Sequence, residues 1–174
     1  VRGGVGMIIT GGITPHPSGG KGAKLSEPSE VPMHRAVTDA VHAADPQVKI
    51  CMQILHSGSI ANVDEPVGPS PVQSRIARQA PIELDADGIE EQIAAFANCA
   101  ALAKDAGYDG VEVIGSAGYL ISTFLVEKTN QRSDEWGGSW ENRMRFAREV
   151  VRRVRAAIGP EMILIFRISA MDML

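Results

Sequence analysis

The chain has 174 residues, of which 44% are hydrophobic and 22% are charged; such fractions are typical of a globular protein and exclude a disordered or fibrous one. Lys and Arg total 17 against 21 Asp and Glu, a formal net charge of −4, so the overall basic character of proteins that bind nucleic acid or anionic membranes is missing. No apolar run approaches the roughly 20 residues of a membrane-spanning helix. The two cysteines are far apart and support neither a disulfide framework nor a zinc site. From these features together we expect a soluble, cytoplasmic protein.

The first part of the chain predicts two buried strands joined by a helix. Residues 6–10 form an apolar run without polar alternation, which is typical of a strand buried on both faces of a parallel sheet. A loop rich in Gly, Pro and Ser follows, and then a helix that begins near Pro32. The second strand is predicted at residues 49–56. The apolar positions of the helix follow helical spacing and are Val37, Ala40, Val41 and Ala44.

The same alternation continues after a long connection. Residues 57–84 contain four prolines, and loops of this length in compact domains are usually functional or mobile. The next helix is expected to begin after Asp85 or Asp87 as its cap and to end at Gly107. A third strand is predicted at residues 110–115. The apolar face of this helix consists of Ile89, Ile93, Phe96, Ala97 and Ala100.

A last helix is expected between the cap Ser139 and Gly159, followed by a fourth strand at residues 162–169. The core positions of this last helix are Ala147, Val150, Val151, Val154 and Ile158. Strand and helix therefore alternate throughout, which predicts an α/β protein with a parallel sheet. Two architectures fit this pattern, an open doubly wound sheet and part of an eightfold barrel. A complete barrel needs roughly 250 residues, so we interpret residues 1–174 as part of one TIM-barrel domain.

Three predicted strands interrupt their apolar runs with one polar residue each: Gln53, Glu112 and Arg167. A charge buried in a strand is costly unless it is paired, so Glu112 and Arg167 could form a structural ion pair between neighbouring strands. The alternative is a functional role. It is favoured for Gln53 and Arg167 because both lie toward the carboxyl ends of their strands, where parallel α/β proteins bind ligands.

Other residues that could take part in binding or catalysis do not match known motifs. The Gly-Gly-Lys-Gly run at residues 19–22 lacks the Ser or Thr and the upstream glycine of a phosphate-binding loop, and no GxGxxG turn follows a strand. The four histidines show no metal-ligand spacing. We expect His34 and His42 to be solvated helix residues, whereas His56, at a strand end, is a candidate for contact with a ligand.

Several longer motifs follow one another along the chain: Gln-Ile-Leu-His-Ser-Gly at residues 53–58, Gly-Tyr-Leu at 118–120, Asn-Gln-Arg-Ser-Asp-Glu-Trp-Gly-Gly-Ser at 130–139 and Asn-Arg at 142–143. With these motifs the chain resembles the old yellow enzyme family of FMN-dependent barrel oxidoreductases. Residues 108–138 look most like the FMN barrel of bacterial 2,4-dienoyl-CoA reductases. The resemblance covers essentially the whole chain and implies that its strands are the second to fifth of the barrel.

The resemblance also implies roles for single residues. Gly11 matches the glycine whose backbone lies against the flavin, Gln53 the glutamine that hydrogen-bonds the flavin pyrimidine ring, and Arg167 the arginine beside its N1/O2 edge. An amide offers a donor and an acceptor side by side, and a guanidinium favours the negative charge of reduced flavin. Tyr119 matches the tyrosine that protonates the substrate, since a phenol keeps its proton at neutral pH. Lys128, near the barrel mouth, could meet a CoA phosphate or remain solvated.

The sequence departs from the family at two positions where many members carry a His and a His or Asn that bind the substrate carbonyl; here they are Ile114 and Ala117. Their absence argues against a generic small-enone reductase and agrees with the dienoyl-CoA branch. The resemblance therefore implies an FMN-dependent ene-reductase that reduces a 2,4-dienoyl-CoA with electrons from NAD(P)H. FAD and an iron–sulfur cluster would belong to other parts of the full-length protein.

Three alternatives remain open at this point. The protein could reduce another enone, as other family members do. It could be a non-catalytic truncated barrel, because half a barrel exposes its edge strands. It could also be a phosphate-handling isomerase or aldolase barrel without flavin. We expect the 174-residue segment alone to be inactive and to bind FMN weakly.

Overall fold

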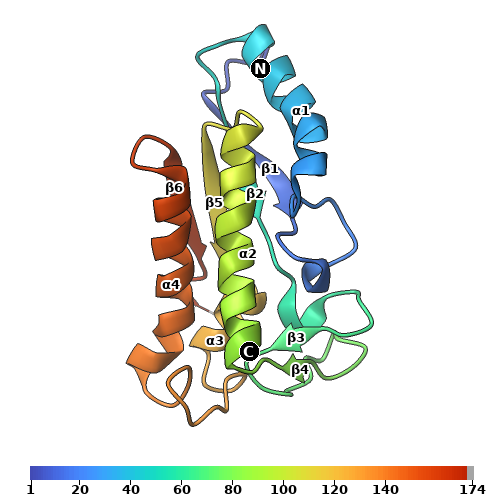
Figure 1. The fold of residues 1–174 in the computed structure, drawn as a ribbon, viewed down its shortest axis with the longest axis vertical. Helices are drawn as coiled ribbons and strands as arrows, with labels where there is room; N and C mark the ends of the chain where they lie inside the picture. Colours follow the sequence, from blue (N-terminus) through green and yellow to red (C-terminus); the bar gives the residue numbers. More distant parts are fainter. Residues whose placement is uncertain (172–174) are drawn as a thin grey trace.

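A computed structural model describes residues 1–171. Its main sheet is parallel and has the strand order β1-β2-β5-β6, so the order in the sheet follows the order in the chain (Figure 1). All four predicted strands are confirmed. They are β1 (Met7–Ile13), β2 (Lys49–Ile54), β5 (Gly110–Gly115) and β6 (Ile163–Ile168).

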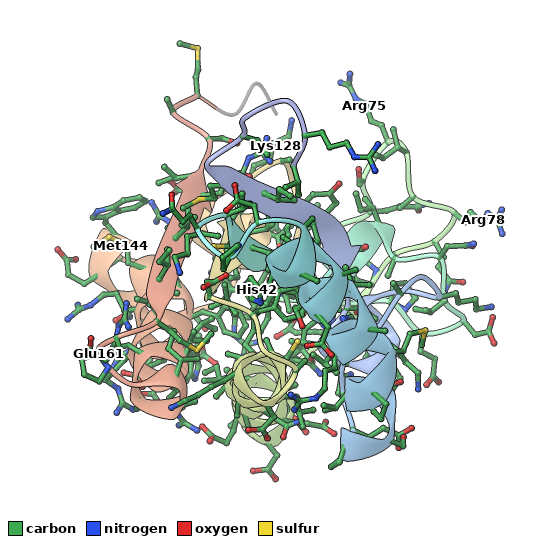
Figure 2. All side chains as sticks on the ribbon, turned by 90° about the horizontal axis from the view of Figure 1, so that it is seen from above. His42, Arg75, Arg78, Lys128, Met144 and Glu161 are labelled. Carbon is green, nitrogen blue, oxygen red and sulfur yellow. The ribbon has the colours of Figure 1, made fainter. Side chains whose placement is uncertain are left out.

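The long helices lie on one side of this sheet (Figures 1 and 2). They are α1 (Val31–Ala44), α2 (Ala86–Asp105) and α4 (Trp140–Ile158), and a short helix, α3 (Leu120–Leu125), follows β5. A doubly wound sheet reverses its strand order and carries helices on both faces, whereas a barrel keeps the chain order and places every helix outside. The structure therefore decides for part of a (β/α)8 barrel.

Local sequence signals set the helix boundaries. Of the two aspartates that could begin α2, Asp85 is the N-cap: its side chain accepts a hydrogen bond of 2.8 Å from the backbone N–H of Gly88. The Ser139 side chain likewise accepts from the backbone N–H of Asn142 at the start of α4. Gly159, with φ 79°, ends α4 in a conformation that other residues rarely adopt.

The core lies between the sheet and helices α2 and α4. Every second residue of β2 and β5 points into it, and both helices bury most of their predicted apolar faces there. Ala97 and Val151, at the margins of those faces, remain partly exposed. The fully buried members from sheet and helices include Met52, Ile54, Val111, Val113, Ile93, Phe96, Val150 and Val154.

Helix α1 forms where predicted but buries a different face. Val37, Ala40 and Ala44 are exposed, while His34 and Thr38 are buried. The Thr38 hydroxyl donates to the carbonyl of Ala106 and the His34 ring hydrogen-bonds the Tyr108 hydroxyl at 3.0 Å; these bonds tie the polar face of α1 to the turn between α2 and β5. The expectation that His34 is solvated is therefore wrong.

Two further expectations need correction. Strand β1 is expected to be buried on both faces, but Met7 and Ile9 are 40% and 41% exposed on the face of the sheet opposite the long helices. The strand also continues through Gly11 and Gly12, with a shift of register against β2 between Ile9 and Gly12. The long connection contains a short parallel pair that the sequence did not predict, β3 (Val67–Gly68) and β4 (Ile82–Glu83).

Candidate functional site

The face of the main sheet opposite the long helices, here called the open face, carries the polar strand residues. Gln53 on β2 and Glu112 on β5 are register partners, and Ile165 on β6 is the next partner in the same layer. Arg167 lies two residues beyond Ile165, toward the carboxyl end of β6, and is the register partner of Ile114. Gln53, Glu112 and Arg167, the open-face cluster, therefore share one face across three adjacent strands.

Within this cluster, Gln53 and Glu112 are hydrogen-bonded to each other. The Gln53 side-chain amide donates to the Glu112 carboxylate at 2.7 Å, and Glu112 is 5% exposed. The Gln53 backbone N–H donates to the Thr10 hydroxyl at 3.0 Å, which fixes the strand at this point. A buried carboxylate thus has the amide, and not a cation, as its partner.

Arg167 is exposed and stands apart from Glu112. Within residues 1–171, no carboxylate lies within the 4.0 Å ion-pairing distance of its guanidinium, so the structural Glu112–Arg167 pair considered above is not formed. Strands β2 and β6 are two strand spacings apart, about 10 Å. Gln53 and Arg167 could therefore approach one planar ring from two sides, as their predicted roles require.

The two consecutive glycines of β1 differ in what surrounds them. A Cβ on Gly12 would lie 2.9 Å from the Cβ of Leu55, so packing requires a glycine there. A Cβ on Gly11 would meet no described atom within 4 Å. Nothing in the described part of the chain requires glycine at position 11, and its backbone borders open space, which fits a group bound against it.

Tyr119 follows a constrained turn at the carboxyl end of β5. Ala117 has φ 61° and is the one non-glycine residue among residues 1–171 with positive φ; Gly118 follows with φ 75°. The Ser169 hydroxyl, just after β6, accepts from the Ala117 N–H at 3.1 Å, and the His56 carbonyl accepts from the Leu120 N–H at 3.0 Å. Tyr119 itself is the half-buried N-cap of α3. Segments from three strands thus hold this turn.

His56 is buried and its two ring nitrogens are both used within the chain. Nδ1 accepts from the Gly58 N–H at 3.0 Å, so Nε2 carries the proton and donates to the Ser18 hydroxyl at 3.1 Å. Burial, with a smaller contribution from His16, lowers the pKa of His56 to about 3. The ring is neutral and 1% exposed, so the expectation of a ligand contact is not supported.

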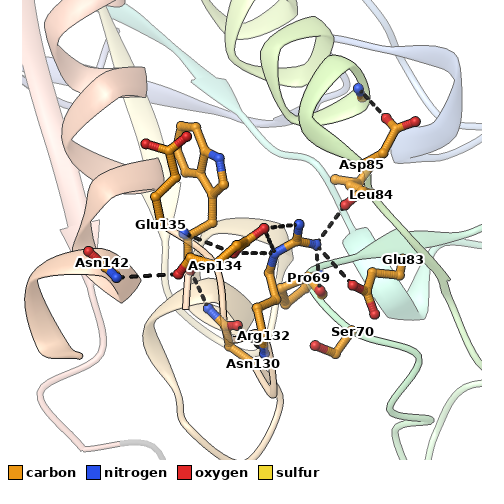
Figure 3. A network of polar contacts seen from close by, with 12 residues as sticks. Pro69, Ser70, Glu83, Leu84, Asp85, Asn130, Arg132, Asp134, Glu135 and Asn142 are labelled. Atoms are coloured by element: carbon orange, nitrogen blue, oxygen red, sulfur yellow. Dashed lines mark hydrogen bonds and ion pairs between the residues drawn. The ribbon is translucent and has the colours of Figure 1, made fainter. Parts of the chain in front are cut away.

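The long motif at residues 130–139 builds a structural connection, shown in Figure 3. The buried Arg132 guanidinium pairs with Asp134 and Glu83 and donates to the carbonyls of Pro69 and Leu84 at 3.0 and 2.6 Å. Hydrogen bonds and charge from Asp134 raise the pKa of Arg132. This Arg132 network joins the loop after α3 to the 57–84 connection, so much of the motif serves the fold rather than a ligand.

The remaining candidates lie at the periphery. Lys128 is exposed in the turn after α3 (Figure 2) and has no hydrogen-bond or ion-pair partner among residues 1–171. His42 is partly exposed and contacts Asp109 at 2.8 Å. In the same residues no helix is both long and apolar enough to cross a membrane, and no group of three or more His, Cys, Asp or Glu side chains is placed to bind a metal ion.

The strand order, which follows the chain, and the helices on one side of the sheet define this chain as a segment of a (β/α)8 barrel. It belongs to the NADH:flavin oxidoreductase / NADH oxidase family, whose pattern it matches over residues 1–174. Membership in a flavin family disfavours the alternative of an isomerase or aldolase barrel.

Relatives place the segment within larger proteins. A metal reductase of Desulforamulus reducens is 41% identical over 177 residues, which span 98% of this chain and 26% of that protein. An NADH oxidase of Thermoanaerobacter brockii is 39% identical over 178 residues, spanning 97% and 27%. The solved structure of a 2-naphthoyl-CoA reductase in complex with 2-naphthoyl-CoA superposes with a TM-score of 0.88 at 34% identity, covering 95% of this chain and 28% of that one.

The chain thus spans about a quarter of the two curated relatives. Their names refer to metal reduction and NADH oxidation, and the structural neighbour acts on a naphthoyl thioester. These names support the flavin oxidoreductase family but do not single out its 2,4-dienoyl-CoA reductase branch.

Proposed function

We propose that this segment is part of a complete barrel that binds FMN, takes electrons from NAD(P)H and reduces a C=C bond activated by a neighbouring carbonyl group. The observation that carries the proposal is the open-face cluster: an amide and a guanidinium face the same side of the sheet, beside the turn that holds Tyr119. The family, which is established, agrees with it.

The residues of the open face fit a flavin. The Gln53 amide uses one N–H on Glu112, which leaves its carbonyl oxygen and a second N–H for the imide edge of the ring. The Arg167 guanidinium favours negative charge at that edge, and the Gly11 backbone leaves room for a flat group. Bound FMN supplies the hydride for the substrate.

Tyr119 is the proposed acid. Its position after the turn at the end of β5 is fixed by bonds to the segments that follow β2 and β6. A phenol held there donates its proton to the substrate carbon that does not receive the hydride. Ile114 and Ala117 offer no side-chain donor to a substrate carbonyl, so these two positions do not supply that donor.

The substrate class has one finer candidate, a conjugated acyl-CoA such as a 2,4-dienoyl-CoA. Two observations support it, the apolar residues at positions 114 and 117 and the 34% identity to a reductase solved with an acyl-CoA, whereas the names of the curated relatives support the family in general. Exposed Lys128 is the proposed contact for a CoA phosphate. In this form of the proposal, FAD and an iron–sulfur cluster lie in other parts of the protein.

The test uses the complete protein. It is expected to purify with visible flavin absorbance, and Tyr119→Phe is expected to lower turnover by about 100-fold or more while NAD(P)H still reduces the flavin. Stopped-flow spectroscopy separates the two half-reactions, and a dienoyl-CoA compared with a cyclic enone separates the substrate classes.

A colourless protein that binds no added FMN would refute the proposal. Weak or absent FMN binding by the segment alone is the expected result, and full activity of the segment would refute the need for a complete barrel.

A further inference from the structure

The Glu112 carboxylate is a buried charged group on the open face that the proposed reaction does not use. It is 5% exposed, and the Gln53 amide nitrogen at 2.7 Å is the one side-chain hydrogen-bond partner that its oxygens have among residues 1–171. Within the same residues no cation lies within 4.0 Å of it. A buried carboxylate without a cation is costly, so a local role is needed to account for it.

A carboxylate restricts the amide that it contacts. An ionised carboxylate only accepts hydrogen bonds, whereas an amide has a donor end and an acceptor end that occupy nearly the same shape. With Glu112 at one side, the Gln53 amide has to turn its nitrogen toward the carboxylate. Its carbonyl oxygen and second N–H are then directed away from Glu112 in one fixed arrangement instead of two interchangeable ones.

The strand register keeps this pair in place. Gln53 and Glu112 are register partners on adjacent parallel strands, and the layer before them is closed by Cys51, Gly110 and Ile163. Gly110 has no room for a Cβ, which would lie 2.6 Å from Ile163 and 2.9 Å from the Cys51 sulfur. The pair therefore rests on a tightly packed layer and cannot move deeper into the sheet.

We propose that Glu112 is a positioning residue for the flavin: it fixes the Gln53 amide so that the amide presents a carbonyl and an N–H to the imide edge of FMN. Its negative charge, close to that edge, also opposes the addition of electrons there, and Arg167, one layer further along β6, partly offsets this effect. This inference rests on the proposed function.

The first experiment replaces Glu112 by Gln in the complete protein. Glu112→Gln keeps the shape of the side chain but removes its charge and its acceptor-only character, so the Gln53 amide can adopt either orientation. We expect FMN to bind the flavin-free protein about tenfold more weakly and the midpoint potential of bound FMN to become more positive. Fluorescence titration and spectroelectrochemistry measure these two quantities. Glu161→Gln, at an exposed glutamate before β6, is the matched control and should change neither.

Two more variants separate positioning from a purely structural role. Glu112→Asp keeps the charge but is too short for the contact, so affinity should fall while the potential stays near that of the wild type. In a Gln53→Ala background, Glu112→Gln should have no further effect on affinity, because the residue that it positions is gone. Equal effects of Glu112→Gln with and without Gln53 would overturn the inference, as would wild-type affinity and potential in the single variant.

The failure of the proposed function gives a different result. If the protein is not a flavoprotein, the wild type itself binds no FMN. If it is one but Glu112 does not position Gln53, then Gln53→Ala weakens FMN binding while Glu112→Gln leaves it unchanged. Where Glu112→Gln does not yield folded protein, Glu112→Asp carries the same test, and an unchanged affinity in that variant contradicts the inference.

Discussion

The Arg132 network and the open-face cluster are both polar and both join distant segments, but they use their bonding capacity differently. Arg132 spends its donors on two carboxylates and two backbone carbonyls of the chain itself. In the open-face cluster, Gln53 uses one N–H within the chain, and Arg167 has no carboxylate partner in residues 1–171. The first cluster is complete without a ligand, whereas the second retains donors and acceptors for one.

This difference shows that a long family motif does not by itself mark the ligand-binding site. The residues around Arg132 belong to the most extended of the motifs that carry the family resemblance, yet their contacts are structural (Figure 3). Single polar residues in apolar strands are weaker signals, yet they mark the face where donors and acceptors remain. Buried polar groups are normally satisfied, so the groups that the chain leaves partly unsatisfied at the carboxyl ends of parallel strands are the ones to assign to a ligand.

The largest effect should come from the Arg132 network. Arg132→Ala leaves two backbone carbonyls and two carboxylates without their donor, and we expect the free energy of unfolding to fall by about 3 kcal/mol. Urea unfolding measures it, with the exposed Arg75→Ala as a control that should change stability by less than about 0.5 kcal/mol. If Arg132→Ala kept wild-type stability and lost FMN binding instead, the Arg132 network would belong to the ligand site and would not be a structural cluster.

A pH-dependent effect is expected at His56, which is also satisfied within the chain. Its pKa is about 3 when folded and near 6.5 when unfolded, so the unfolded state binds the extra proton between these values. Stability should therefore fall as the pH drops below 6.5, by up to about 1.4 kcal/mol per pH unit, and be fully retained above that value.

The variant that checks this effect is His56→Asn, whose amide oxygen can still accept from the Gly58 N–H. It should be less stable than the wild type at neutral pH but should lose less stability between pH 6.5 and about 4.5. Carboxylates such as Asp109 and Asp134, whose pKa values are lowered from 3.8 in the fold, destabilise it only at lower pH. An unchanged slope in urea unfolding across the upper window would show that His56 is not the titrating group.

Sequence patterns were sufficient for the strands of the main sheet, the long helices and the caps of α2 and α4, because hydrophobic period and capping residues act locally. They failed for the buried face of α1, where hydrogen bonds from His34 and Thr38 to a turn some 70 residues away outweigh the apolar positions. They also left the partner of Glu112 open. The strand order predicts that Glu112 has a neighbour on each side, but only the register, which depends on the whole sheet, makes that neighbour Gln53 rather than Arg167.

The smallest effects are expected at the two glycines of β1. Alanine at one position should lower stability, and alanine at the other should weaken FMN binding. Gly12→Ala places a Cβ 2.9 Å from Leu55, so the free energy of unfolding should fall by about 1 kcal/mol. Gly11→Ala meets no described atom within 4 Å and should leave stability within about 0.5 kcal/mol. We propose that the flavin lies against the Gly11 backbone, so an added methyl group at this position should weaken FMN binding by the complete protein by about tenfold. Thermal unfolding and FMN titration of both variants measure the contrast; an alanine at position 11 that leaves FMN affinity unchanged would remove Gly11 from the site, because open space beside a backbone has functional meaning only where a ligand fills it.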